Sequence, residues 1–414
     1  MKCFFRILWL LLISVSGIYG EQVNLESYAS GFDSIPIAVF EFENKEGEEL
    51  DKNQPSEIIE YDLEFTGKFK VARNIEAEMS EFKSKEIGLF IDGEYTVEGG
   101  DVSLKCYLRD ASDMNILLGR KYSGGKDVMR RMVHKFSGEV YDMITGDKNP
   151  FMSRITYMNK YKDSFSIDLM DYDGHNNTTM RKTGTVQVFP VFSGGKELLW
   201  VGFDRGKPDI YKGSIYSGNA NILLYSRYVE TSPDVSEVDG KIVYVSSSKG
   251  TPNLFRCEND GSGNRQLTFS NAIESSPAWS PDGYHVAFIS NRAGNPHIYV
   301  IDKDGTNTKR LTFKGKYHDS PSYSPDGKQI AYTGRKDGTY EIFIINNDGT
   351  GNKSVTDNVD GSNEYPAWSP DGSHIAFVST RGKGRDIYSI GIDGKGITKL
   401  THTGCADMPD WSGF

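Results

Sequence analysis

Two series of charged residues recur along the C-terminal part of the chain and could form an electrostatic binding surface. Acidic residues stand just before a recurring proline, and basic residues stand 14 to 16 positions after it. The acids are Glu230, Glu274, Asp319, Glu364 and Asp407, and the bases are Arg205, Lys249, Arg292, Arg335 and Arg381. Such residues either form ion pairs within the fold or attract a partner of complementary charge. The pattern alone leaves both interpretations open.

Residue patterns typical of catalysis are missing from the sequence. The seven histidines form no His-Glu-x-x-His pair, and there is neither a Gly-x-Ser-x-Gly nucleophile motif nor a phosphate-binding glycine loop. Cys106, Cys257 and Cys405 lack the close spacing of a zinc or redox site, and we expect them to be unpaired packing residues. The sequence therefore predicts no catalytic residue, no metal and no cofactor.

The elements that must position the charged residues follow from an internal repeat. A Ser-Pro-Asp-Gly turn recurs at residues 280–283, 324–327 and 369–372, and apolar strands follow each copy. The recurring prolines stand at positions 190, 233, 277, 321, 366 and 409, with spacings of 43 to 45 residues. A period in the low forties with four short strands per unit is typical of a β-propeller blade. The sequence predicts a mostly β protein with a six-bladed propeller over residues 149–414.

The ends of the repeat array predict how the ring closes. The last unit stops after one strand, whereas the segment near Ile155 has the later strands of a blade without a first strand. We expect the C-terminal strand to complete that blade, because a closed ring leaves no exposed sheet edge. The connections between blades and the loops between middle strands open at one end of a propeller. Both charged series should therefore surround the same mouth of the channel.

The N-terminal part of the chain has a different character. Residues 1–20 are typical of a secretory signal peptide, with Lys2 and Arg6 before an apolar stretch that leads to Gly20. Residues 21–148 lack the repeat, and their hydrophobic periodicity predicts helices over 55–65 and 129–144 and strands over 35–42, 89–97, 102–108 and 116–122. The sequence thus predicts a small α/β domain before the propeller.

Charge and hydropathy exclude two classes of partner. The formal net charge of −10 removes the attraction to phosphate on which most nucleic-acid binding depends, so we expect no nucleic-acid partner. No segment after the signal peptide is apolar for long enough to cross a bilayer, so we expect no direct membrane insertion. An exported, acidic protein is the expected product.

Three stretches resemble a known family. Residues 58–69 (IIEYDLEFTGKF), 134–146 (HKFSGEVYDMITG) and 151–157 (FMSRITY) are similar to a helix, a last helix before the propeller and a first propeller strand of the TolB family. That family supplies the periplasmic component of the Tol-Pal envelope system, with the same order of signal peptide, α/β domain and six-bladed propeller. The resemblance covers nearly the whole chain.

The resemblance implies a non-enzymatic hub in the periplasm. In the family, the propeller binds the peptidoglycan-associated lipoprotein Pal, and the segment after the signal peptide engages TolA, a protein anchored in the inner membrane. These contacts support outer-membrane integrity and envelope constriction during cell division. On this sequence the TolA contact falls at Gln22, Val23, Asn24 and Leu25.

We expect the charged rim of the propeller to receive the Pal-like partner. The rim residues are Arg205, Glu274, Arg292, Tyr317, His318, Asp319, Arg335, Asn363, Glu364, Arg381 and Asp407. Two other functions stay open: a secreted hydrolase or lyase that contains a propeller, and a carbohydrate-binding or adhesin propeller. On its own the chain is expected to be a monomer.

Overall fold

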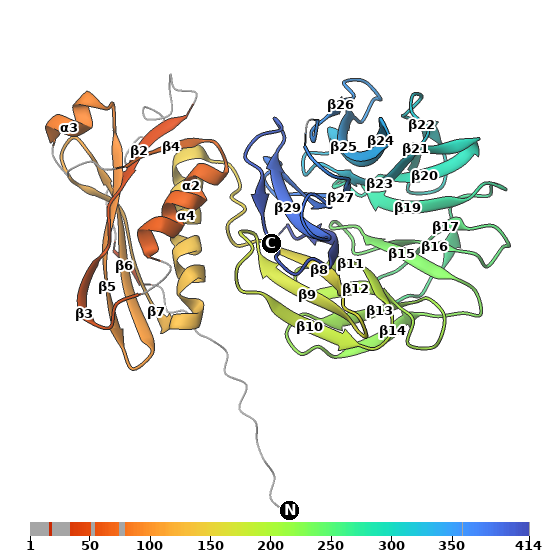
Figure 1. Cartoon of the computed structure of the whole chain (residues 1–414), viewed down its shortest axis with the longest axis horizontal. Coiled ribbons are helices and arrows are strands. Elements are labelled where there is room, and N and C mark those ends of the chain that lie inside the picture. The colour runs from red at the N-terminus through yellow and green to blue at the C-terminus, as the bar shows by residue number, and fades with distance from the viewer. Residues whose placement is uncertain (1–15, 19–33, 51–53, 74–78, 358, 414) are drawn as a thin grey trace, which may run out of the picture. The chain divides into compact units, whose positions relative to one another are not determined.

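The computed structural model describes residues 16–18, 34–50, 54–73, 79–357 and 359–413. The chain divides into two compact units, Met1–Met152 and Ser153–Phe414. The described part of the first unit combines a sheet with helices, whereas that of the second consists of strands and loops (Figure 1). The predicted fold class, a small α/β region followed by a six-bladed propeller, is confirmed.

The first unit is built on one sheet, with strand order β1-β7-β6-β5-β2-β4 and β3 paired to β5. Strands β5, β6 and β7 are long and antiparallel, while β2 runs parallel to β4 and β5. The strands are β1 (Ser16–Ile18), β2 (Ile35–Val39), β3 (Glu43–Gly47), β4 (Phe69–Ala72), β5 (Leu89–Glu98), β6 (Asp101–Asp110) and β7 (Ile116–Gly125).

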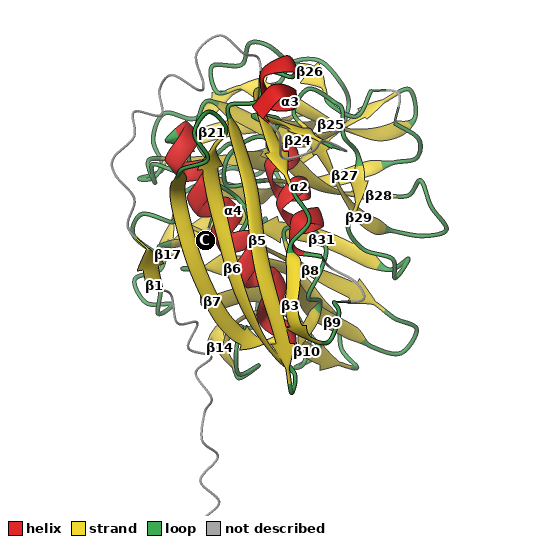
Figure 2. Ribbon diagram, turned by 90° about the vertical axis from the view of Figure 1, so that its left-hand side faces the viewer, coloured by secondary structure: helices red, strands yellow, loops and turns green. Residues whose placement is uncertain are grey.

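Helices α2 (Pro55–Phe65) and α4 (Met129–Thr145) cover one face of this sheet (Figure 2), and the 3-10 helix η1 (Lys126–Val128) leads into α4. The short helix α3 (Met79–Ser84) packs on the other face (Figure 1), where Phe82 stacks on Phe90 of β5 with 5.1 Å between ring centroids. Proline at the first position of α2 suits a helix start, because its missing N–H would have no partner there. The apolar stripe of α4, with Met132, Phe136 and Val140 fully buried, forms core as its spacing predicts.

The second unit consists of six antiparallel four-stranded sheets, here called blades I to VI. Blade I consists of β31 (Ala406–Trp411), β8 (Arg154–Lys160), β9 (Phe165–Asp171) and β10 (Thr178–Thr183). Blade II consists of β11 (Gln187–Ser193), β12 (Glu197–Gly202), β13 (Asp209–Ser214) and β14 (Ala220–Leu224). Blade III consists of β15 (Glu230–Val235), β16 (Ile242–Ser246), β17 (Asn253–Cys257) and β18 (Arg265–Gln266). Blade IV consists of β19 (Glu274–Trp279), β20 (His285–Ala293), β21 (Asn295–Asp302) and β22 (Lys309–Arg310). Blade V consists of β23 (His318–Tyr323), β24 (Gln329–Lys336), β25 (Thr339–Asn346) and β26 (Lys353–Ser354). Blade VI consists of β27 (Asn363–Trp368), β28 (His374–Ser379), β29 (Asp386–Gly391) and β30 (Thr398–Lys399).

Blade I joins the two ends of the second unit. The C-terminal strand β31 pairs antiparallel with β8, with Trp411 opposite Ile155. The indole N–H of Trp411 donates to the hydroxyl of Ser153 at 2.8 Å, and the backbone N–H of Ser412 donates to the carbonyl of Arg154 at 2.8 Å. The first strands of the six blades therefore form a closed ring.

Two local devices repeat around this ring. In the Ser-Pro-Asp-Gly turn of blade IV, the hydroxyl of Ser280 donates to Asp282 and the carboxylate of Asp282 accepts the backbone N–H of Tyr284 at 2.9 Å, while Gly283 takes φ +68°. The residue before each recurring proline also has a positive φ, between +49° and +56°, and marks a bulge that bends the innermost strand. These residues are Phe189, Ser232, Ser276, Ser320, Tyr365 and Met408.

Candidate functional site: the connection end of the propeller

The antiparallel order of the strands gives the propeller two different ends. Connections between blades and the loops between second and third strands lie at one end, which we call the connection end. The loops between first and second strands, and between third and fourth strands, lie at the other, the turn end. Both predicted charged series belong to the connection end, where the structure arranges them in two layers.

A buried polar row crosses blades III to VI below the loops of this end. In each blade a threonine near the outermost strand accepts a backbone N–H from the third strand and contacts a polar side chain near the start of that strand. The pairs are Thr268 with Asn253, Thr312 with His297, Thr356 with Glu341 and Thr401 with Asp386. All eight residues are buried, so the row is an internal framework that fixes the ends of the strands.

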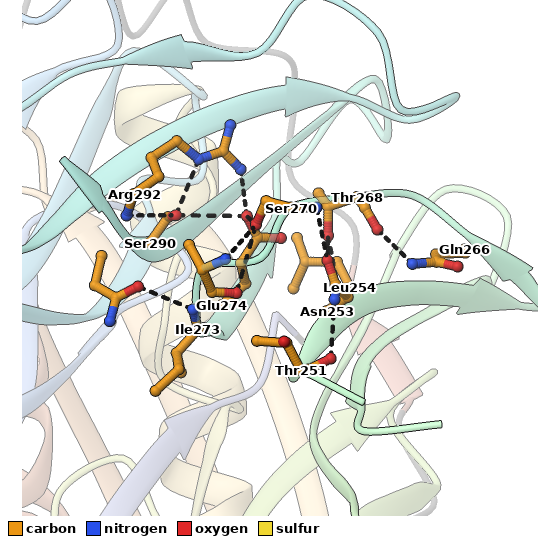
Figure 3. Close-up of polar contacts among 12 residues, drawn as sticks. Thr251, Asn253, Leu254, Gln266, Thr268, Ser270, Ile273, Glu274, Ser290 and Arg292 are labelled. Atoms are coloured by element: carbon orange, nitrogen blue, oxygen red, sulfur yellow. Dashed lines mark hydrogen bonds and ion pairs between the residues drawn. The ribbon is translucent and has the colours of Figure 1, made fainter. Parts of the chain in front are cut away.

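Blade IV shows how a charged pair is built into this framework (Figure 3). The carboxylate of Glu274 is fully buried and accepts hydrogen bonds from Arg292 and, at 2.8 Å, from the hydroxyl of Ser270. The Nε of Arg292 donates to the hydroxyl of Ser290 at 3.0 Å, and its guanidinium lies 4.9 Å from the ring centroid of Tyr299. Glu274 and Arg292 therefore form an internal ion pair within one blade.

The acidic series is split by a one-residue shift along the innermost strands. Glu230 and Glu274 stand three positions before the recurring proline, whereas Asp319, Glu364 and Asp407 stand two positions before it. Successive residues of a strand point to opposite faces, so the two groups meet different surroundings. The first group is buried and the second is partly exposed. The sequence pattern placed both groups at one end but concealed this division.

Two of the partly exposed acids, Glu364 and Asp407, bind an arginine that the sequence analysis missed. Arg385 donates to the carboxylate of Asp407 at 2.7 and 3.1 Å and to Glu364 at 2.9 Å, joining blade VI to blade I. Burial alone would lower the pKa of Arg385, but the two carboxylates, Asp407 above all, raise it beyond its ordinary value. Arg385 follows Arg381 by four residues, outside the repeated spacing, and a search for an arginine directly before the third strand could have found it.

Blade V places three predicted residues side by side with different exposure. The hydroxyl of Tyr317 donates to Asp319 at 2.9 Å, and burial together with this carboxylate raises the pKa of Tyr317. His318 is buried in the position that Glu274 holds in blade IV, and its Nδ1 lies 3.0 Å from the carbonyl oxygen of Pro296. Tyr317 and Asp319 are partly exposed, whereas His318 is buried as part of the framework.

The remaining predicted residues also divide by exposure. Arg205 is exposed and lies 5.2 Å from the ring centroid of Tyr225, and exposed Arg335 has no ion-pair partner within the described part of the chain. Arg381 is half-buried over the ring of Tyr388, and Asn363 is fully buried beneath it. The predicted TolA contact at residues 22–25 and the predicted signal peptide up to residue 15 and after residue 18 lie outside the described residues.

A cavity of about 590 Å³ lies at the opposite, turn end of blades I to III. Asp234 and Asp410 line it, and burial raises the pKa of these carboxyls to about 7 and about 6. Each carboxylate accepts a backbone N–H from the next blade, from Trp279 and Phe192 respectively. In the described part of the chain, no group of three or more His, Cys, Asp or Glu side chains is arranged to hold a metal ion.

The fold defines a class of protein, a six-bladed propeller that follows a small α/β unit in the sequence. Comparison with known proteins specifies it further. The family model for the TolB beta propeller domain matches residues 141–414, and the chain belongs to this family.

Individual relatives agree with this assignment. The Tol-Pal system protein TolB of Geobacter sulfurreducens is 33% identical over 214 residues, which cover 48% of this chain and 50% of that protein. Its namesake from Dechloromonas aromatica is 28% identical over 228 residues, 53% of each chain. The chain thus spans about half the length of the curated relatives it matches. The crystal structure of TolB from Acinetobacter baumannii, at 22% identity, superposes with a TM-score of 0.77 over 97% of this chain and 99% of that one, which shows the shared fold.

Among the residues that the structure describes, no helix is both long enough and apolar enough to span a membrane.

Proposed function

We propose that this protein is a non-enzymatic interaction hub of a Tol-Pal system in the periplasm. In this proposal the connection end of the propeller binds a Pal-like peptidoglycan-associated lipoprotein, and residues 22–25 engage a TolA-like inner-membrane protein. The hub supports outer-membrane integrity and envelope constriction during cell division. The observation that carries the proposal is membership of the TolB propeller family over residues 141–414.

The geometry of the connection end supports a binding role. Asp319, Glu364 and Asp407 are partly exposed, the last two as partners of Arg385, and Arg205 and Arg335 are exposed in sequence-equivalent loops of blades II and V. Charged groups of this kind favour rapid, correctly oriented association with a complementary surface. In blades III to VI the buried polar row fixes the ends of the strands from which the loops start, so little ordering is needed there when a partner binds.

Titration calorimetry with two purified partners tests the proposal. The full mature chain should bind the lipoprotein, prepared without its acyl chain, and should separately bind the periplasmic part of the TolA-like protein. Deleting residues 22–25 should abolish the second interaction and leave the first unchanged. At about 100 µM protein, even a millimolar dissociation constant would give a weak heat signal. If no heat of lipoprotein binding is seen at that concentration, the proposal is overturned.

A further inference from the structure

The most exposed apolar side chains of the connection end lie on three successive connections between blades. They are Tyr225 and Val229 after blade II, Phe269 and Ile273 after blade III, and Phe313 after blade IV. Phe269 and Phe313 are 79% and 72% exposed, and Tyr225 is 66% exposed. We call these five residues the aromatic arc. Large apolar side chains gathered on a surface in this way are typical of interaction sites.

The arc is confined to one part of the end. Phe269 and Phe313 directly follow Thr268 and Thr312 of the buried polar row. The residues that follow the equivalent threonines of blades V and VI are Asp357 and His402, which are exposed and polar. The buried polar row is the same in blades III to VI, so these blades differ here only in the side chain that follows the threonine.

Hydrogen bonds hold the arc in place from below (Figure 3). In the connection after blade III, the hydroxyl of Ser270 donates to Glu274 at 2.8 Å, and the N–H of Ile273 donates to Asn291 at 2.9 Å. The connection after blade II repeats this arrangement: Ser226 donates to Glu230 at 2.7 Å, and the N–H of Val229 donates to the hydroxyl of Ser247 at 3.1 Å. The fold thus presents apolar side chains on ordered loops, which lowers the entropy cost of binding.

The charge around the arc is positive although the chain as a whole is acidic. The loops at 225–229, 247–251, 269–273, 291–296 and 313–317 contain no aspartate or glutamate. They carry five exposed basic residues: Arg227, Lys249, Arg292, Lys314 and Lys316. Arg292 is paired with Glu274, and the other four make no ion pair within the described residues. A surface with an apolar centre and a basic border fits a partner of opposite charge.

We propose that the aromatic arc is the apolar centre of the docking surface, and that its partner is a protein face with apolar side chains bordered by aspartate and glutamate. The proposal rests on the proposed function and adds the sector of the propeller that binds and the chemistry of the partner. A protein face is favoured because phenylalanine, tyrosine and arginine are enriched at the energetic centres of protein interfaces.

Paired variants at the two ends of the propeller test this inference. Phe269→Ser combined with Phe313→Ser should weaken binding of the acyl-free lipoprotein at least about tenfold, because such centres account for most of the affinity. Tyr216→Ser combined with Tyr284→Ser, at the turn end, is the matched control, since both tyrosines are exposed aromatic residues. It should leave affinity unchanged. All four residues are exposed, so the melting temperature should stay within about 2 °C of wild type.

Charge is tested separately with Lys314→Glu combined with Lys316→Glu. This variant should weaken binding and flatten its dependence on salt, whereas the phenylalanine variant should keep the salt dependence of wild type. Equal affinity of wild type and the phenylalanine variant would overturn the arc and leave the proposed function standing. Failure of wild type itself to bind the lipoprotein would overturn both. The chain could instead bind phosphatidylglycerol vesicles or purified peptidoglycan through Phe269 and Phe313 without binding the lipoprotein. That result would assign the arc to another class of ligand and overturn the inference.

Discussion

Blades IV and VI place an arginine in the same surroundings, but only blade IV provides it with a carboxylate. Arg292 and Arg381 each donate through Nε to a serine hydroxyl, at 3.0 and 3.1 Å. Each also lies over a tyrosine ring, at 4.9 and 4.5 Å from the centroid. The first strand of blade IV supplies Glu274 beneath the guanidinium, whereas that of blade VI supplies Asn363 at the equivalent position.

The difference shows that the framework of a blade is shared while its charge is not. In blade VI the Nη2 of Arg381 is buried without an acceptor, and the Oδ1 of Asn363 is buried without a donor, among the described residues. Burial lowers the pKa of Arg381, because the charged guanidinium has lost water without a hydrogen-bonded carboxylate, and the attraction of Asp360 does not offset that loss. An unpaired buried polar group costs about 1 to 3 kcal/mol. The basic series of the sequence thus combines a paired arginine with one that lacks its pair.

The largest expected difference between the two blades is the loss of stability when each arginine is removed. Arg292→Ala leaves the buried carboxylate of Glu274 uncompensated, and we expect the free energy of unfolding to fall by about 3 kcal/mol. Arg381→Ala removes a guanidinium that has no carboxylate partner, so its cost should be about 1 kcal/mol, mainly lost packing on Tyr388.

Urea denaturation of both variants measures this difference. Arg335→Ala, which removes an exposed arginine without an ion pair in the described residues, is the control and should change stability by less than about 0.5 kcal/mol. Equal losses of stability for Arg292→Ala and Arg381→Ala would contradict this expectation, because they would show that the ion pair with Glu274 adds nothing to what Arg292 contributes.

Much of the fold follows from the sequence because its determinants are local. The Ser-Pro-Asp-Gly turn at 280–283 and the spacing of the prolines fix the blades, and the apolar stripe of α4 fixes that helix. The register of an innermost strand is different, since a shift of one residue turns a side chain to the opposite face. Glu274 and Asp319 look alike beside their prolines, yet one is buried and the other is partly exposed.

The site was harder to predict for a second reason. Whether a charged residue is paired depends on residues far apart in the chain, as when Arg385 of blade VI meets Asp407 of blade I. The exposure of Phe269 and Phe313 was equally hidden, because each follows a Leu-Thr pair that continues the apolar pattern of the outermost strand. Periodicity predicts burial for such residues, and only the path of the connection shows that they leave the blade.

Supplying the missing carboxylate in blade VI should have a smaller effect on stability, of opposite sign. Asn363→Glu places at Arg381 the same acid that Arg292 has in blade IV, beside the equivalent serine, Ser379. We expect the free energy of unfolding to rise by about 1 to 2 kcal/mol, the contribution of a hydrogen bond to a charged group. Asn363→Gln is the control, because glutamine has nearly the same size as glutamate but carries no charge. If both variants are equally destabilised, the connection after blade V leaves no room for the longer side chain.

Blade V offers a third solution at this position, a pair of histidines whose effect depends on pH. His318 occupies the place of Glu274, and its ring lies 4.9 Å, centroid to centroid, from that of His297. Both side chains are buried. Burial lowers the pKa of both imidazoles, and that of His297 falls to about 4 with further contributions from His318 and Arg310.

The sign of the pH effect follows from these shifts. The folded protein keeps the rings neutral, whereas the unfolded chain takes up protons near pH 6.5, so stability is complete above about pH 6.5 and falls as the pH decreases toward about 4. His297 should account for about 1 kcal/mol of lost stability between pH 7 and 5.5. The buried carboxyls of Asp234 and Asp410, with pKa values of about 7 and about 6, act in the opposite direction, because they favour the folded state when protonated.

The difference between wild type and His297→Gln at each pH isolates the imidazole from these carboxyls. Urea denaturation between about pH 7 and 5.5 should give a gap in free energy of unfolding that narrows by about 1 kcal/mol as the pH falls. His402→Gln, at an exposed histidine of the connection after blade VI, should follow the wild-type curve throughout. A constant gap for His297→Gln would mean that His297 takes up its proton equally well in the folded and unfolded states, and that its contact with the ring of His318 does not depend on a neutral imidazole.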